Sequence, residues 1–267
     1  MLPMTDAADI MVSQLVHTAR CIESHVPESG VRISLQRIGA AMLCACESWP
    51  HDIGFNRAYG VDATDRSAVG SIVTEFAQRG IRPLLEMSPG TVDASACAHL
   101  SQLGLKHLWS VTELMGDATP ADEAMDPASA IHRMLPTGSD AFAELAVEAY
   151  ECSPTVRPQQ LVLKASICHD PQSRCLVGSI DGVSCAIGIM TFVGGIAVLS
   201  GGATLRSYRR RGLQRALLSQ RIRLAYACGI HDFYVRAMPG SASQRNLERV
   251  GLRPRHLLQV WGHPLPA

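Results

Sequence analysis

The chain has 267 residues, with 24 basic and 24 acidic side chains, no formal net charge at pH 7 and a hydrophobic share of 47%. This length exceeds that of one typical domain, so we expect two domains around a substantial buried core. The balanced charge argues against a protein that binds nucleic acid duplexes through a broad basic surface.

The 9 cysteines are scattered through apolar surroundings. Their odd number and their spacing predict neither a disulfide framework nor a metal site. We expect most of them to be reduced thiols of the core in a cytoplasmic protein. The N-terminal segment carries acidic residues early and has no uninterrupted apolar stretch, so it is not expected to be a signal peptide.

The first 120 residues alternate between predicted helices and strands. Apolar side chains at helical spacing indicate helices at 10–24, around 72–77 and at 94–103, and Gly80 and Gly104 are expected C-caps. An apolar stretch at 38–49 and strand-like segments at 81–87 and 105–114 complete this unit. The polar, acidic segment 116–127 contains prolines and predicts a linker, so the expected domains are residues 1–120 and 121–267.

The second unit is expected to begin with a strand at 131–135. Two helices follow, one at 139–152 with Ser139 or Asp140 as its cap and one at 158–166. Later elements are a helix at 212–228, a strand at 232–238, a short helix at 241–250 and a final strand at 257–261. In the long helix the expected buried stripe consists of Leu213, Ala216, Leu217, Leu224, Ala227 and Cys228, and the residues expected on the opposite side are Arg215, Ser219 and Arg223.

An uncharged stretch at 183–205 is long enough to cross a bilayer as a helix. It contains the pair Gly194 and Gly195 between two apolar runs, and Asp181 and Gly182 lie just before it. Both pairs suit the positive φ angles of tight hairpin turns. We therefore predict three antiparallel strands here and no transmembrane helix.

Four arginines precede a lone glycine at the start of the long helix: Arg206, Arg209, Arg210 and Arg211 come before Gly212. A helix that begins directly after a strand offers unpaired amides and the positive end of its dipole, which favour an anion such as a pyrophosphate. A glycine lets the anion approach because it has no Cβ. The motif by itself also fits a hydrated helix start, since neither a P-loop nor a full dinucleotide fingerprint is present.

The order of elements around this motif adds a second indication. A strand, the run RRRGLQRALL, an amphipathic helix, a strand, a short helix and RVGL, together covering about 130–264, resemble the GCN5-related N-acetyltransferase (GNAT) family. Arg209, Gly212 and Gln214 take the three fixed positions of its acyl-CoA motif, Arg/Gln-x-x-Gly-x-Gly/Ala, where a glutamine departs from the usual small residue. The resemblance implies an α/β (α+β) fold, with a GNAT-like mixed sheet flanked by helices and a smaller, degenerate GNAT-like unit before it.

The resemblance also implies a ligand and its contacts. Acetyl-CoA would be the acyl donor and a small-molecule or peptide amine the acceptor. The implied cofactor-binding residues are Ala203, Thr204 and Leu205 of the preceding strand, Arg209, Arg210, Arg211, Gly212, Leu213, Gln214, Arg215 and Ala216 of the motif, and Ser243 and Asn246 of the short helix. A reading without a ligand fits equally well. In it, Ser243 or Ser241 is the N-cap of the short helix, and Asn246 is a solvated polar residue.

Catalytic residues are not predicted. The position of the family's usual tyrosine acid holds Leu247, and no Asp, Glu or His lies between 194 and 205 to act as a base. We expect an N-acetyltransferase, and the missing acid and base keep open a second function, a non-catalytic acyl-CoA sensor or interaction module. An RNA-binding arginine helix is a third hypothesis, which the single aromatic residue of the helix, Tyr226, weakens.

The expected partners follow from this function. We expect no nucleic acid and no membrane partner, and the sequence does not predict the oligomeric state or the identity of the acceptor. The unit at 1–120 has no Arg-x-x-Gly-x-Gly/Ala loop, so we expect it to shape the acceptor cleft without binding CoA.

Overall fold

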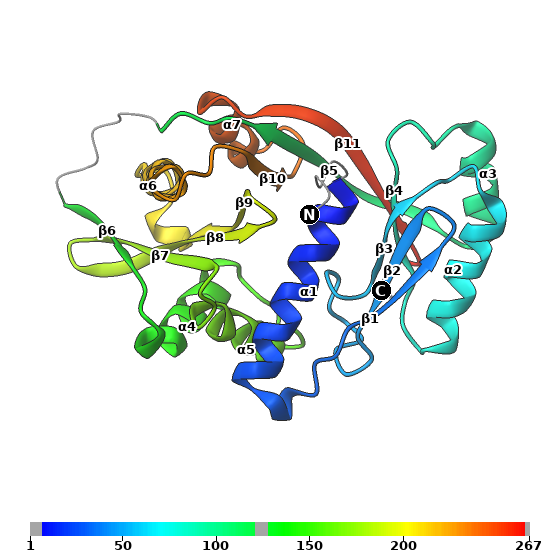
Figure 1. Ribbon diagram of the computed structural model, residues 1–267, viewed down its shortest axis with the longest axis horizontal. Coiled ribbons are helices and arrows are strands. Elements are labelled where there is room, and N and C mark those ends of the chain that lie inside the picture. The colour runs from blue at the N-terminus through cyan, green and yellow to red at the C-terminus, as the bar shows by residue number, and fades with distance from the viewer. Residues whose placement is uncertain (1–6, 121–127, 265–267) are drawn as a thin grey trace.

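The structure, a computed structural model, describes residues 7–120 and 128–264. They form one 11-stranded mixed sheet with helices on both faces (Figure 1). The strand order is β1-β2-β3-β4-β11-β5-β10-β9-β8-β7-β6. The strands are β1 (Ser34–Ile38), β2 (Ala41–Ala45), β3 (Arg57–Val61), β4 (Leu84–Met87), β5 (Lys106–Gly116), β6 (Ser129–Arg133), β7 (Ser173–Ile180), β8 (Val183–Val193), β9 (Ile196–Thr204), β10 (Phe233–Ala237) and β11 (Arg253–Gly262). The helices are α1 (Ala7–His25), α2 (Arg66–Gln78), α3 (Ala94–Gln102), α4 (Ser139–Ala149), α5 (Arg157–Cys168), α6 (Leu213–Ala227) and α7 (Ala242–Arg249).

The predicted α/β fold class is confirmed. The predicted elements appear in the expected order, with shifted ends. β4 begins later than expected, at Leu84, and β11 is longer than the predicted final strand. Most of the predicted linker, residues 121–127, lies outside the described residues.

The two halves of the chain, residues 7–120 and 128–264, exchange their last strands. β11 pairs antiparallel with β4 of the first half, and β5 pairs antiparallel with β10 of the second half. The exchanged strands also pair with each other, from Arg253 opposite Met115 to Gly262 opposite Lys106. They are the long green and red ribbons along the upper side of Figure 1. Each half therefore completes its part of the sheet with a strand from the other.

Helix α1 lies between the two halves and packs on both (Figure 1). Near its C-terminal end, Ile22 joins a buried cluster with Trp49 of the first half, against which Val162 of α5 packs. Near its N-terminal end, Ile10 packs against Tyr234 of β10. α1 therefore covers the sheet where the halves meet.

The other helices cover the two faces of the sheet. α2 buries Ile72 and Phe76, and α3 buries Leu100, against the strands of the first half. In the second half, α4 and α5 pack on one face of β7, β8 and β9, and α6 packs on the other, while α7 packs against β11. The predicted capping of α4 by Ser139 or Asp140 is wrong, because the helix begins at Ser139 itself, with Gly138 as its N-cap and no side-chain cap bond.

The predicted three-strand meander is confirmed as β7, β8 and β9. Asp181 and Gly182 have φ angles of 50° and 77°, and Gly194 and Gly195 have φ angles of 58° and 86°. These positive angles are those that tight hairpin turns require. Among the described residues, no helix combines the length and the apolar character needed to cross a membrane.

The buried face of α6 differs from the predicted stripe. Its buried residues are Leu213, Leu217, Leu218, Ser219, Arg221, Ile222 and Ala225. Ala227 and Cys228 were expected to be buried and are exposed, and Ser219 was expected to face away and is buried. Two of these buried residues, Ser219 and Arg221, are polar, so apolar character alone misplaced the stripe.

Candidate functional site

Strands β9 and β10 separate in the second half of the sheet. Their parallel pairing covers three residues of each strand and ends at Leu199 and Val235. β9 nevertheless continues to Thr204 and β10 to Ala237. The edge of β9 beyond Leu199 is therefore available to a ligand that hydrogen-bonds like a strand.

A bulge in β9 accompanies this separation. Opposite Gly188 of β8 lie two residues of β9, Gly201 and Gly202, because the register shifts between Ile187 and Ile189. Gly201 has a φ of 61°, and a Cβ on it would come within 2.5 Å of the Ile189 side chain. Only glycine fits there, so the bulge is built into the sequence.

The side chain of Arg221 supports the bulge from α6. It is 5% exposed, and its Nη1 donates to the carbonyls of Ile189 at 3.0 Å and Ser200 at 3.1 Å. A Cβ on Gly188 would lie 3.2 Å from its Nε, so the glycine makes room for the guanidinium. Burial lowers the pKa of Arg221 to about 10. The group is still charged at neutral pH and places a fixed positive charge beside the separated strands.

A cleft of about 880 Å³ opens where the strands separate. Its walls are β9, the arginine loop and the first turns of α6 and α7. The predicted cofactor residues that line it are Ala203, Thr204, Arg209, Arg210, Arg211, Gly212, Leu213, Gln214, Arg215, Ser243 and Asn246. Leu205 and Ala216 lie outside this lining. The fold thus brings segments far apart in the sequence into one cavity.

The loop before α6 has a strained backbone. Arg210 has a φ of 67° and Gly212 a φ of 82°. For Arg210 this left-handed conformation is unfavourable, and such strain is found most often where a loop holds a ligand. Gly212 is the N-cap of α6 and has no side chain to bond the first amides.

The amides at the start of α6 differ in their hydrogen bonds. Those of Arg215 and Ala216, two of the implied cofactor-binding residues, donate to the carbonyl of Gly212 at 3.0 and 3.1 Å. Those of Leu213 and Gln214 have no acceptor within the described part of the chain. These two amides form the donor set of the helix start.

Two of the arginines shape the loop. Arg209 donates from Nε to the carbonyl of Thr204 at 3.0 Å and from Nη2 to Glu151 Oε1 at 2.6 Å. Arg211 lies over the ring of Tyr208, 5.4 Å from its centre. Arg209 therefore ties the loop to the end of β9, which fixes the position of the helix start relative to the strand edge.

Gln214, which departs from the family pattern, turns toward β9. Its Nε2 donates to the carbonyl of Ala203 at 2.7 Å and to Thr204 Oγ1 at 2.9 Å. Its Oε1 lies 2.9 Å from where a Cβ on Gly202 would be. The side chain therefore rests against the strand rather than over the loop.

The short helix α7 presents two of the predicted polar residues. Ser241 is its N-cap, and its Oγ accepts a hydrogen bond from the backbone N–H of Gln244 at 3.1 Å. Ser243 is therefore not the cap. Ser243 and Asn246 both line the cleft. Leu247 is buried in the core, so this position supplies no acid.

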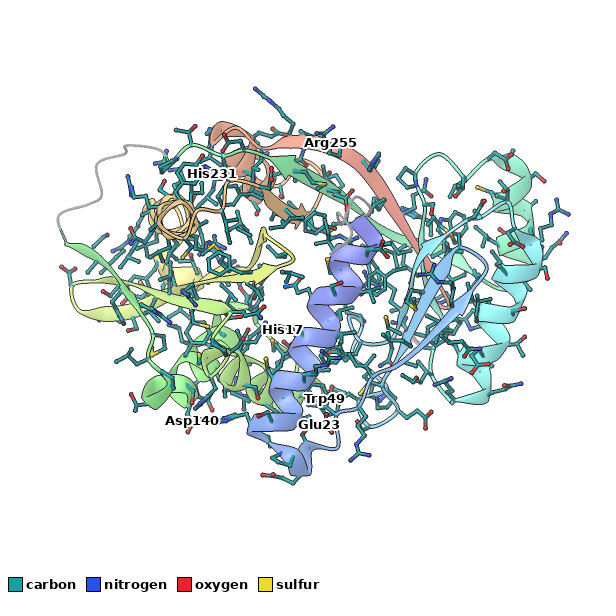
Figure 2. All side chains as sticks on the ribbon, viewed as in Figure 1. His17, Glu23, Trp49, Asp140, His231 and Arg255 are labelled. Carbon is teal, nitrogen blue, oxygen red and sulfur yellow. The ribbon has the colours of Figure 1, made fainter. Side chains whose placement is uncertain are left out.

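A second pocket, of about 440 Å³, lies on the α1 face of the sheet. Both halves contribute to it: Glu86 comes from β4, Glu113 from β5 and Arg236 from β10. Ala8 of α1 and Arg255, labelled on β11 in Figure 2, also line it. Arg236 lines both the pocket and the cleft, so the two cavities share this residue of β10.

Two arginines hold Glu86 in this pocket. Arg236 binds it in a bidentate pair, with Nη1–Oε2 at 2.8 Å and Nη2–Oε1 at 2.7 Å. Arg57 adds a third bond, from Nη1 to Oε2 at 3.1 Å. All three side chains are largely buried. The Glu86 carboxylate is thus neutralised and fixed in place.

Glu113 is a different kind of carboxyl group. It is 0% exposed; its Oε1 accepts the Tyr234 hydroxyl at 2.7 Å and its Oε2 has no hydrogen-bond partner. Burial raises the pKa of Glu113, and the bond from Tyr234 and the charge of Arg236 oppose this shift. A buried carboxyl group with a raised pKa and a free oxygen is suited to take up a proton.

Sequence analysis missed Glu86, Glu113 and Arg236. Each is the charged residue in the middle of a short apolar strand segment, LLEM, VTELM and FYVRAM. Charged side chains are almost never fully buried unless they are paired. A search for isolated charges within predicted strands would have found all three.

No protein-family model matches the chain, and no curated protein sequence matches it. Solved structures do match. A GCN5-related N-acetyltransferase from Kribbella flavida aligns with a TM-score of 0.67 at 19% identity, over 98% of this chain and 97% of that one. A GCN5-related N-acetyltransferase from Sphaerobacter thermophilus aligns with a TM-score of 0.63 at 13% identity, over 98% and 94%.

A tandem GNAT protein from the clavulanic acid biosynthesis pathway aligns with a TM-score of 0.56 at 11% identity, over 96% of this chain and 98% of that one. All three alignments run through both halves of the chain. The chain therefore has the fold of the GCN5-related N-acetyltransferases, including the tandem arrangement, and the resemblance seen in the sequence is confirmed at the level of the fold.

Proposed function

We propose that the protein is an acyl-CoA-dependent N-acetyltransferase that moves an acetyl group from acetyl-CoA to an amine. The observation that carries this proposal is the separation of β9 from β10 beyond Leu199 and Val235. The resulting cleft is lined by Leu213 and Gln214, whose amides at the start of α6 have no acceptor among the described residues, and it shares Arg236 with the second pocket.

The cleft suits the parts of acetyl-CoA. The amides of Leu213 and Gln214 and the dipole of α6 would bind the diphosphate, and the arginines of the loop would add charge. The pantetheine arm would hydrogen-bond along the edge of β9 toward Thr204, where no neighbouring strand competes. Bound acetyl-CoA supplies the activated thioester, and the chain fixes its orientation.

The pocket on the α1 face suits an amine. The carboxylate of Glu86 is already paired with Arg236 and Arg57, so Glu113, whose Oε2 has no hydrogen-bond partner, is the group that would accept the proton of an ammonium substrate. The amine nitrogen then attacks the thioester carbonyl carbon, an N–C bond forms and the C–S bond breaks. The second proton of the nitrogen passes to the departing sulfur, so that CoA leaves as its thiol. The proton from the ammonium group stays on Glu113 until solvent removes it.

The division of labour between the halves follows from this proposal. Residues 121–267 would form the unit that binds acetyl-CoA, and residues 1–120 the unit that shapes the acceptor site, since Glu86 and Glu113 come from the first half. The exchange of β5 and β11 means that the halves are best tested together, in the full chain.

The test is the release of CoA thiol when the full chain meets acetyl-CoA and a panel of amines. The panel includes amino acids, polyamines, aminoglycosides and a peptide with a free N-terminus. Thiol release that depends on one class of amine supports the transferase. Tight binding of acetyl-CoA with no amine-dependent release supports the second candidate, an acyl-CoA sensor, which the buried Leu247 at the acid position favours. No binding at all rejects both.

A further inference from the structure

Three side chains converge where α1 faces the second half of the chain. His17 and Cys21 lie one turn apart on α1, and Asp170 follows α5, in the second half. The imidazole, thiol and carboxylate atoms of these residues all lie within 4.8 Å of one another. His17 Nε2 is 2.8 Å from Asp170 Oδ2 and 3.8 Å from Cys21 Sγ. Figure 2 shows His17 on the side of α1 that faces the second half.

These separations are close to those of a tetrahedral zinc site. With ordinary Zn–N, Zn–O and Zn–S bonds, a nitrogen and a sulfur ligand lie about 3.6 Å apart and a nitrogen and an oxygen about 3.3 Å apart. The sulfur–nitrogen distance of 3.8 Å already fits, and the nitrogen–oxygen distance of 2.8 Å needs to widen by about half an ångström.

The carboxylate of this cluster is already oriented. Asp170 Oδ1 accepts a hydrogen bond from the backbone N–H of Gln172 at 2.9 Å, and Oδ2 accepts one from the Ser173 hydroxyl at 2.5 Å. Ser173 in turn contacts Thr191 Oγ1 at 2.8 Å. A hydrogen-bonded second layer that fixes a ligating carboxylate is a recurring feature of metal sites.

The cluster is also accessible. The side chain of Asp170 is buried, that of His17 is 25% exposed and Cys21 is half-buried. A metal ion can therefore enter from solvent, and water can complete the fourth position of a site with three protein ligands.

We propose that His17, Cys21 and Asp170 bind a divalent transition-metal ion, Zn²⁺ by the chemistry of its ligands, and that this ion ties α1 to the second half of the chain. Binding replaces the thiol proton of Cys21, which is released to solvent. The site is separate from the cleft and the pocket described above and does not depend on the proposed activity. Mixed nitrogen, sulfur and oxygen ligands favour Zn²⁺ over Mg²⁺ or Ca²⁺, which prefer oxygen alone.

The test is a titration of the full chain, stripped with a chelator, with Zn²⁺ in competition with a metal indicator. We expect one ion per chain, and we expect Cys21→Ser and His17→Gln each to weaken binding about 100-fold or more. With Co²⁺ in place of Zn²⁺, the native chain should show a thiolate-to-metal charge-transfer band that Cys21→Ser abolishes. Zn²⁺ should also raise the Tm of the native chain and not that of Cys21→Ser.

Two further cysteines control for adventitious binding. Cys228 is exposed and Cys97 is half-buried, and both lie outside the cluster. Cys228→Ser and Cys97→Ser should keep the affinity and the cobalt band. The proposal is overturned if the native chain binds no stoichiometric Zn²⁺, or if the cobalt band survives in Cys21→Ser.

Discussion

Arg236 of β10 and Glu86 of β4 form a bidentate ion pair across the junction of the two halves, with N–O distances of 2.8 and 2.7 Å. The pair sits where the exchanged strands β5 and β11 lie between β10 and β4. Because both side chains are buried, the pair is hardly screened by solvent. The junction of the halves and the proposed acceptor pocket therefore depend on the same charges.

Removal of the Glu86 charge should destabilise the protein strongly. Glu86→Gln leaves Arg57 and Arg236 buried without their carboxylate, which typically costs about 3–5 kcal/mol. The measurement is the free energy of unfolding from urea titration. The control is Glu75→Gln, which removes the α2 carboxylate paired with Arg79, a pair more exposed than that of Glu86, and should cost about 0.5 kcal/mol or less. Equal effects of the two variants would show that the junction does not rely on this pair.

Removal of the Glu113 carboxyl group should abolish proton transfer. Glu113→Gln keeps the size of the side chain and a bond to Tyr234, so we expect kcat to fall about 100-fold or more with little change in acetyl-CoA affinity. The acidic limb of the pH–rate profile, which the ionisation of Glu113 sets, should disappear with it. Glu75→Gln is again the control and should behave as the native chain does. A variant that keeps both its rate and its acidic limb would exclude Glu113 as the base.

The same substitution should change the pH dependence of stability. Burial raises the pKa of Glu113 in the folded chain above its ordinary value of 4.5, so the folded state holds this proton more tightly than the unfolded state. The stability that the protonated group contributes is full below pH 4.5 and is lost as the pH rises through the raised pKa. Relative to Glu113→Gln, the native chain should therefore lose stability from pH 4.5 toward neutral pH. Urea titrations across this range measure the difference, and a constant difference would contradict the raised pKa.

A negative charge at the start of α6 should prevent cofactor binding. Gly212→Glu places a carboxylate where the diphosphate is proposed to lie, and we expect the affinity for acetyl-CoA to fall more than about 100-fold. A carboxylate near a helix N-terminus interacts favourably with the positive end of the helix dipole, so the fold should persist. The control is Gly212→Ala, which meets the same strain at a φ of 82° without the charge. Calorimetric titration should show much weaker binding for the glutamate variant, and equal affinities in the two variants would count against the diphosphate site.

Local sequence signals predicted the elements around the cleft correctly. Gly182, Gly194 and Gly195 predicted the turns of the meander, because few other residues adopt positive φ angles at low cost. Gly212 after the arginines predicted the helix start, because a strand followed by a glycine and an amphipathic helix is a local pattern. The phase of α6 was harder to predict, since Ser219 and Arg221 are polar and buried.

Contacts between distant segments could not be predicted in this way. Glu113 gains its raised pKa and its bond to Tyr234 only because β5 is inserted beside β10. His17 meets Asp170 only because α1 packs against the second half. In both cases the two residues are far apart along the chain, and their spacing in the sequence carries no sign of the contact.

The sequence by itself determined the turns, the helix start and the order of strands and helices, since these depend on backbone angles and on the periodicity of neighbouring residues. Tertiary structure alone decided the strand exchange, the carboxyl groups at the junction and the histidine, cysteine and aspartate cluster. These features arise when segments far apart in the chain bury their apolar faces together, and the free energy of that burial depends on the whole fold rather than on any single segment.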